Sequence, residues 1–380
     1  MWSGCTLFLV VSSVAGFAPP NVHTVNVRVA QSFKKGLYGL SMLSTSRPAT
    51  DGVFEILKSA SLVSAESGKV CKGQDKIVNT HDPLGKLFGK NPKTLVVVMP
   101  QLGDFDSGEY TENLMAVRSD LQKAGIALRL IGIGNAASAR RFASFNHVPM
   151  DLLYADLVGS LHQRLGLHGG PNWDVPDFIP KAILKWFADY VGASEDPDHR
   201  GVARSWLNYM AMCAGIAAPN TLSEIFRGYI GDKSAPERLR PEEIVSIGDN
   251  LVAVRGVTDV KLGPIQYQSL WKNEFGYQRP AELATVRLRY MVEVLSNFSQ
   301  YVPDQKYLHL RGATFLLDAD GRVLYEHRDT GVLAYSKTMA RPLTFLQPYI
   351  GDKALNPLQL GDNRYQTSLI SISGGTLPKR

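Results

Sequence analysis

The sequence predicts an α/β protein, built on a mixed sheet with flanking helices and interrupted by a large helical insert. Three observations predict it. Short apolar runs alternate with helical patterns over 93–170, a strand pattern returns over 304–350, and the segment 171–303 between them has apolar residues at helical spacing. The chain has 380 residues, of which 44% are hydrophobic and 20% charged, so it can bury a full core.

The first fifty residues differ in composition from the rest, because the first acidic residue is Asp51. An apolar run followed by small residues is typical of a signal peptide, which we place at 1–16, and the basic, Ser-containing stretch 17–50 is typical of a transit peptide. The junction Val14-Ala15-Gly16-Phe17-Ala18-Pro19 resembles the two-part plastid leaders of algae with complex plastids. We therefore expect a plastid protein, in the stroma or at the thylakoid surface. A plain secretory signal is the alternative, although it does not explain such a long acid-free stretch.

The basic charge of the chain belongs mostly to this leader. Lys and Arg number 41 and Asp and Glu 35; without the leader, 37 basic residues face 35 acidic ones, a net charge of about +2. A nucleic-acid partner is therefore not expected. Cys5 leaves with the leader, and the two remaining cysteines lie too far apart in sequence to indicate a disulfide framework. No stretch approaches the roughly 20 apolar residues of a membrane span.

The first half of the domain, 93–170, follows a hydrophilic N-terminal extension at 51–92. The apolar, β-branched run 94–99 predicts a strand buried on both faces. Asp106 or Ser107 is expected to cap the helix that follows, which should end at Gly125.

The next elements continue the alternation of strand and helix. We predict a second strand over 126–133, a helix over 136–145 capped by Asn135, and a third strand over 152–155. Alternation at these lengths implies parallel strands joined by right-handed crossovers.

The remaining segments are the insert, the second half of the domain and the tail. A long helix is predicted over 281–301 within the insert. Two apolar runs, 313–317 and 322–327, flank an Asp-Gly turn and predict a hairpin. The tail 351–380 is polar and is predicted to be mobile.

Together these elements resemble the thioredoxin fold and, more narrowly, the peroxiredoxin-like 2 family of the AhpC/TSA type. The matching pieces are 95–98, 131–134 with 139–142, 154–156 and 311–318. The whole chain, including 100–107 and 275–280, resembles the longer cyanobacterial and plastid members.

The resemblance implies where a redox site would lie. Redox members carry Cys-x-x-Cys at the start of the first helix, where free N–H groups and the helix dipole stabilise a thiolate. Those cysteines fall on Asp104 and Ser107. A carboxylate suits a helix N-terminus but forms neither a sulfenic acid nor a disulfide. Because the family also places an Arg beside the reactive sulfur, here Arg311, we predict an ion pair between Arg311 and Asp104.

We therefore expect a plastid protein with a thioredoxin-like core and without thiol peroxidase activity, serving as a binding or regulatory module in plastid redox or photosynthetic-complex biology. Its partners would be plastid proteins, with peripheral thylakoid contact through the apolar segment 206–218 as an option. No cofactor is assigned, the oligomeric state is not indicated, and the sequence leaves open whether the protein is an enzyme.

Two thiols offer an alternative, an antioxidant enzyme that uses Cys71 or Cys213. Lys69 and Lys72 lie close to Cys71 in sequence and could lower its pKa. Cys213 lies in an apolar helical stripe, where a free cysteine usually acts as a small buried hydrophobe.

A second alternative is a dinucleotide-binding oxidoreductase. Gly132 and Gly134 match G-x-G-x-x-A between a strand and a helix, and Asp156 follows about twenty residues on. The same Gly-x-Gly only turns the chain in thioredoxin-like relatives. No spacing indicates a metal site, and the run 326–329 is interpreted as a solvated strand edge.

Overall fold

The computed structural model describes residues 52–78, 92–219, 221–230 and 279–360, together with Pro236 and six short strands between 244 and 277. The leader, predicted at 1–16 and 17–50, lies outside these residues, as does the end of the tail, 361–380. In the part of the chain described, no helix is long and apolar enough to cross a membrane.

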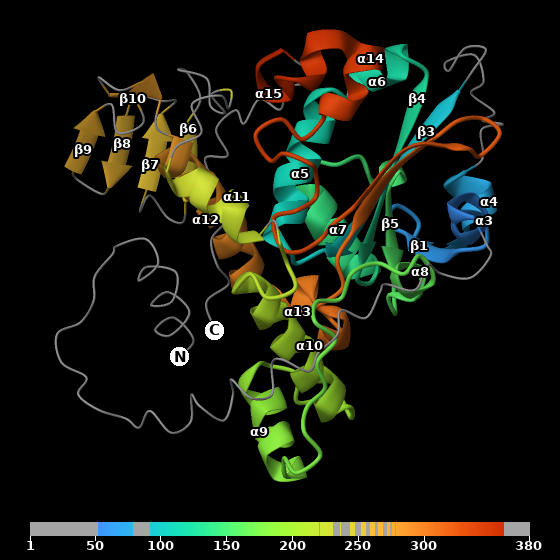
Figure 1. Cartoon of the computed structure of the whole chain (residues 1–380), viewed down its shortest axis with the longest axis vertical. Coiled ribbons are helices and arrows are strands. Elements are labelled where there is room, and N and C mark those ends of the chain that lie inside the picture. Colours follow the sequence, from blue (N-terminus) through green and yellow to red (C-terminus); the bar gives the residue numbers. More distant parts are fainter. Residues whose placement is uncertain are drawn as a thin grey trace. The chain divides into compact units, whose positions relative to one another are not determined.

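The main sheet has seven strands in the order β13-β12-β3-β4-β5-β1-β2 (Figure 1). Strands β3, β4 and β5 are parallel, whereas β12, β13, β1 and β2 each pair antiparallel with their neighbours, so the predicted mixed sheet is confirmed. The strands are β1 (Ser61–Ser64), β2 (Val70–Lys72), β3 (Lys93–Gln101), β4 (Ile126–Ile133), β5 (Leu153–Asp156), β12 (Ala313–Leu317) and β13 (Val323–Arg328).

Strand β3 is buried on both faces because its side chains alternate between two apolar cores. Leu95 and Val97 join one core, and Val96 and Val98 join the other. The first core also holds side chains of α5 (Phe105–Ala116), α6 (Arg118–Lys123) and α7 (Ala136–Phe145). The second holds side chains of α3 (Val53–Lys58) and α8 (Ser160–Arg164), with residues that follow α4 (Gly73–Lys76). The sheet is thus covered by helices on both faces.

Most local elements agree with the sequence patterns. The strand 126–133 and the helix 136–145 have the predicted bounds, and Asn135 forms the N-cap of α7. The hairpin of β12 and β13 is present. The extension 51–92 also contributes to the domain, because β1 and β2 join the main sheet, which its hydrophilic composition did not indicate.

The insert contains more strand than predicted. Its helices are α9 (Lys181–Tyr190), α10 (His199–Cys213), α11 (Thr221–Ile230), α12 (Arg279–Ser296) and α13 (Phe298–Tyr301). Between α11 and α12 lie a four-stranded antiparallel sheet and a two-stranded pair, so a purely helical insert is wrong. These strands are β6 (Ile244–Ile247), β7 (Val252–Arg255), β8 (Asp259–Leu262), β9 (Ile265–Gln268), β10 (Lys272–Asn273) and β11 (Gly276–Tyr277). The short β-branched runs of this segment favour strands. The prolines between them made this signal hard to recognise in the sequence. The predicted helix 281–301 is divided between α12 and α13.

The start of the predicted mobile tail is also ordered. Ala354 is fully buried in the first core, so mobility from residue 351 onward is wrong for the first ten residues. The short helices here are α14 (Gln347–Ile350), η5 (Gly351–Ala354) and α15 (Pro357–Leu360), and elsewhere η2 (Met150–Leu152), η3 (Gln305–Tyr307) and η4 (Thr344–Leu346).

Candidate functional site

The start of α5 is the position that the family resemblance assigns to redox chemistry. Asp104 occupies the N-cap in an extended conformation, but its side chain makes no capping hydrogen bond. The helix therefore begins earlier than predicted, and the expectation that Asp106 or Ser107 caps it is wrong. The Asp106 carboxyl instead accepts a hydrogen bond from the Leu333 N–H at 3.0 Å. The Ser107 hydroxyl has no hydrogen-bond partner among the described residues.

Asp104 pairs with Arg311, as predicted. The Arg311 Nη1 lies 2.5 Å from the Asp104 Oδ2, and both side chains are 0% exposed. Arg311 also donates to the Leu308 carbonyl at 2.7 Å, and its guanidinium carbon lies 5.3 Å from the centre of the Tyr209 ring. A guanidinium can remain charged in this interior only because such partners replace water. Burial alone lowers the pKa of Arg311, but the adjacent carboxylate more than offsets this and raises it.

Two further carboxyl groups lie near this pair, and both are held in their neutral form. Burial raises the pKa of Asp329 to about 8. Burial, and to a smaller extent the charge of Asp104, raises the pKa of Asp106 well above its usual range. Of the three carboxyl groups, Asp104 is the one that forms an ion pair with Arg311.

Asp329 corrects the interpretation of 326–329 as a solvated edge. Its side chain is buried, and its Oδ2 accepts a hydrogen bond from the Gly312 N–H at 3.0 Å. The hairpin register pairs Ala313 with Arg328, which places residue 329 opposite residue 312, beside Arg311. The position of Asp329 beside Arg311 could therefore have been predicted from the hairpin alone. The rest of the run fits a strand edge, where the Glu326 and Arg328 side chains form an ion pair.

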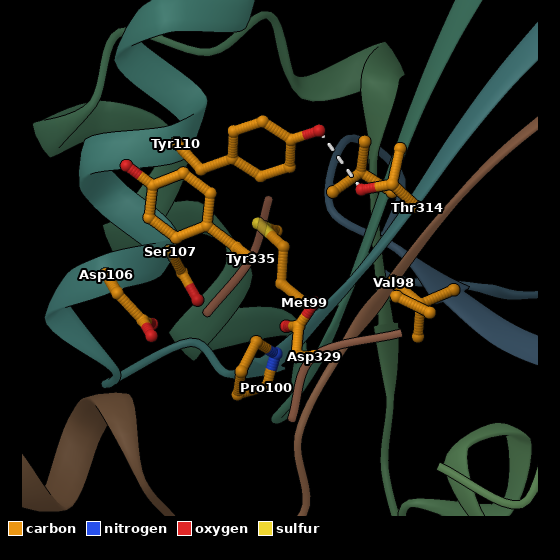
Figure 2. A pocket seen from close by; sticks show the side chains of 11 residues that line it. Val98, Met99, Pro100, Asp106, Ser107, Tyr110, Thr314, Asp329 and Tyr335 are labelled. Carbon is orange, nitrogen blue, oxygen red and sulfur yellow. Dashed lines mark hydrogen bonds between the residues drawn. The ribbon is translucent and has the colours of Figure 1, made fainter. Parts of the chain in front are cut away.

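A small cavity adjoins the acidic groups (Figure 2). Asp106 and Ser107 border it from α5, and Asp329 borders it from the end of β13. Its apolar wall includes Tyr110 and Tyr335, whose rings stack with centroids 4.6 Å apart. The cavity has room for about one water molecule. The site is thus a small cavity with mostly apolar walls and a few polar groups, and it admits only a very small ligand.

Neither alternative thiol has the electrostatics of an activated nucleophile. Burial and the charge of Asp104 raise the pKa of Cys213 to about 11. Burial also raises the pKa of Cys71, whose Sγ donates to the Leu62 carbonyl at 3.4 Å. The proposed lowering of the Cys71 pKa by Lys69 and Lys72 is therefore wrong, because burial dominates.

The glycines of the dinucleotide motif are used for packing. A Cβ on Gly132 would lie 2.5 Å from the Leu102 Cδ2, so the Leu102 side chain fills the space beside this turn. The first turn of α7 is occupied by the Asn135 side chain, which accepts from the Ser138 N–H at 2.9 Å. A pyrophosphate would need this same space and these N–H groups.

Asp156, the proposed ribose ligand of that motif, is also used internally. Its carboxylate accepts hydrogen bonds from the Leu161 N–H at 2.8 Å and the Ser160 N–H at 3.1 Å. It also faces the buried His162, whose other ring nitrogen lies 2.7 Å from the Met99 carbonyl. Gly132, Gly134 and Asp156 are therefore all engaged in packing or hydrogen bonds within the chain. In the described ranges, no group of three or more His, Cys, Asp or Glu side chains could hold a metal ion.

The parallel core, the antiparallel hairpin and helix α5, which begins just after strand β3, define a thioredoxin-type protein. The family model described as AhpC/TSA antioxidant enzyme matches residues 113–331, more than half of the chain, so this protein belongs to that peroxiredoxin-like family. Searches of curated proteins and of solved structures gave no match. The matched segment includes Cys213 and Arg311 but begins after Asp104 and Ser107.

Proposed function

We propose that this AhpC/TSA-type protein has no thiol peroxidase activity and that it serves as a binding or regulatory module in plastid redox or photosynthetic-complex biology. The observation that carries the proposal is the buried ion pair of Asp104 and Arg311. The Asp104 carboxylate lies at the helix end where the family resemblance places a cysteine. It pairs with Arg311, which would otherwise stabilise a thiolate. A carboxylate there cannot be oxidised and reduced in a catalytic cycle.

A hydroperoxide-consumption assay tests the loss of activity. We expect the purified full chain to consume hydrogen peroxide or an alkyl hydroperoxide no faster than its Cys71→Ser/Cys213→Ser variant, with thioredoxin, glutathione or dithiothreitol as reductant. Thiol-dependent turnover that disappears in that variant would instead support the second candidate, an antioxidant enzyme. Cys213 lies one helical turn from Tyr209, whose ring packs on Arg311, and this favours Cys213 over Cys71 as the thiol of that candidate.

Nicotinamide cofactors provide a further control. The packing around Gly132 and Asp156 supports the absence of a dinucleotide site. We expect no thermal shift at millimolar NAD or NADP, and a clear stabilisation would revive the oxidoreductase alternative.

The plastid location rests on the leader, and a reporter fusion tests it. Residues 1–50 fused to a fluorescent protein should deliver it to the plastid of an alga with complex plastids, whereas a fusion that lacks residues 17–50 should stop in the secretory pathway. Recovery of the full fusion outside the cell would contradict this part of the proposal.

The partners would be plastid proteins, in the stroma or at the thylakoid surface. The segment 206–218 supports peripheral contact, because Leu207, Met210 and Ile216 expose large apolar side chains. Affinity capture from plastid extract, with the thylakoid fraction kept separate, should recover a defined set of proteins. Equal recovery with an unrelated thioredoxin-fold bait would contradict a specific binding role.

A further inference from the structure

Helix α10 of the insert brings a thiol to the buried ion pair. Tyr209 and Cys213 are one helical turn apart on α10 and so lie on the same face. Both side chains pack against the first core. The Tyr209 ring also packs on Arg311, which in turn holds Asp104. Side chains from three distant parts of the chain thus form one continuous cluster.

The charges of this cluster decide how reactive the thiol is. Of the charged groups, Asp104 acts most strongly to keep Cys213 protonated, and Arg311 acts in the opposite direction. Asp104 is only 2% exposed, and its Oδ1 has no hydrogen-bond partner in the part of the chain described. A cation beside a thiol favours the thiolate, but here a carboxylate neutralises that cation.

We propose that Cys213 is an oxidisable thiol of this site and that the Asp104 carboxylate blocks its reaction with hydroperoxides by neutralising Arg311. In the unblocked reaction, the sulfur attacks the terminal oxygen of a hydroperoxide, and the O–O bond breaks as the S–O bond forms. The thiol is oxidised to a sulfenic acid, the hydroperoxide is reduced to the alcohol or water, and the thiol proton passes to the departing oxygen. This inference rests on the proposed function, in which the unmodified chain has no turnover.

A second carboxyl group must be removed to lift the block. Burial and the charge of Asp104, two residues away, raise the pKa of Asp106 and keep it neutral, whereas Arg311 favours its ionised form. If only Asp104 becomes neutral, we expect Asp106 to ionise and take its place.

Alkylation of Cys213 in the full chain tests the proposal. The rate with iodoacetamide is followed by peptide mass spectrometry from about pH 6 to pH 11, with Cys71 of the same sample as an internal reference. At about pH 8 we expect the Cys213 rate of Asp106→Asn to equal that of the unmodified chain. The rate of Asp104→Asn/Asp106→Asn should rise about tenfold or more, which corresponds to about one pKa unit. Hydrogen peroxide with dimedone should then label Cys213 in the double variant alone.

Two results would overturn the proposal. One is a folded double variant in which Cys213 reacts within about twofold of the unmodified rate. The other is a Cys213 pKa at or below the free-thiol value of about 8.5 in the unmodified chain. This second measurement needs no variant, so it tests the proposal even if the double variant does not fold. Peroxide turnover by the unmodified chain would overturn the proposed function instead, so the two failures are distinguishable.

Discussion

Helices α5 and α7 begin with the same type of sequence, Asp or Asn at the N-cap and Ser three residues later, but these side chains form different contacts. Each helix follows a parallel strand of the main sheet, with a capping residue and then a serine at the third helical position. In α7, Asn135 and Ser138 form a capping box, and the Ser138 hydroxyl also donates to the Gln300 carbonyl at 2.8 Å. In α5, Asp104 and Ser107 form no such box.

The difference shows that a long-range interaction has displaced a local one at α5. The Asp104 side chain, which local rules assign to the cap, instead binds Arg311, 207 positions away in sequence. Sequences usually agree with local rules, and departures from them concentrate at functional sites. The contrast between the two helix ends therefore supports the start of α5 as the candidate site.

The largest effect should come from separating the buried pair. Arg311→Ala leaves the Asp104 carboxylate buried without its cation, so we expect a loss of about 3–5 kcal/mol in the free energy of unfolding. Asp104→Ala should lose less, because Asp106 can then ionise beside Arg311. In denaturant unfolding, the double variant should lose much less than the sum of the two.

A second ion pair, on α7, provides the matched control. Arg141 bonds Glu293 at 2.7 Å, but its side chain is 35% exposed, so Arg141→Ala should cost at most about 1 kcal/mol. Additive losses at Asp104 and Arg311, within about 0.5 kcal/mol, would show that the two residues do not stabilise each other.

Asp329 should give the next largest effect, with a defined dependence on pH. Its pKa is about 8 in the folded protein, against about 3.9 in an unfolded chain. Between these values the unfolded chain is ionised and the folded one keeps its proton, so stability falls as the pH rises. Asp329→Asn should add about 2–4 kcal/mol near pH 8 and almost nothing near pH 4.

Asp318, in the turn between β12 and β13, supplies a control for which the change in stability with pH has the opposite sign. Hydrogen bonds from Arg322 lower the pKa of Asp318, although burial alone would raise it. Asp318→Asn should therefore reduce stability at neutral pH and have no effect in strong acid. Thermal unfolding across this pH range measures both variants, and a gain for Asp329→Asn that is independent of pH would contradict the assignment.

The smallest effect is expected at the two serines, Ser138 of α7 and Ser107 of α5. Ser138→Ala removes the hydroxyl contacts at the start of α7 and should lower stability by about 1 kcal/mol. Ser107→Ala removes a buried hydroxyl that has no partner among the described residues and should be neutral or slightly stabilising. Equal losses in urea unfolding would mean that α5 is capped like α7.

Local signals explain which elements the sequence predicts well. Strand β4 and helix α7 are specified by nearby residues, an apolar run and a capping pair, and their bounds agree with the structure. Strands β1 and β2 and the strands of the insert were not predicted, because their short segments carry weak periodicity and depend on pairing with partners. Within the site, the ion pair of Asp104 and Arg311 was predicted only through the family resemblance.

The convergence of Tyr209 and Cys213 on that pair could not be predicted from the sequence. It depends on how α10 of the insert packs against the domain, and a helical stripe of apolar residues indicates only that one face is buried. Asp329 could have been placed from the hairpin register, because the residue opposite Gly312 follows directly from the predicted pairing.

The most direct test of the account restores sulfur to the start of α5. We propose that this protein retains the family scaffold and that a carboxylate replaces the reactive group. In a Cys71→Ser/Cys213→Ser background, Asp104→Cys/Ser107→Cys should acquire thiol-dependent hydroperoxide consumption that the background lacks, because Arg311 would then face a thiolate. A folded variant that stays inactive, or a background that already consumes hydroperoxide with thiol, would contradict the account.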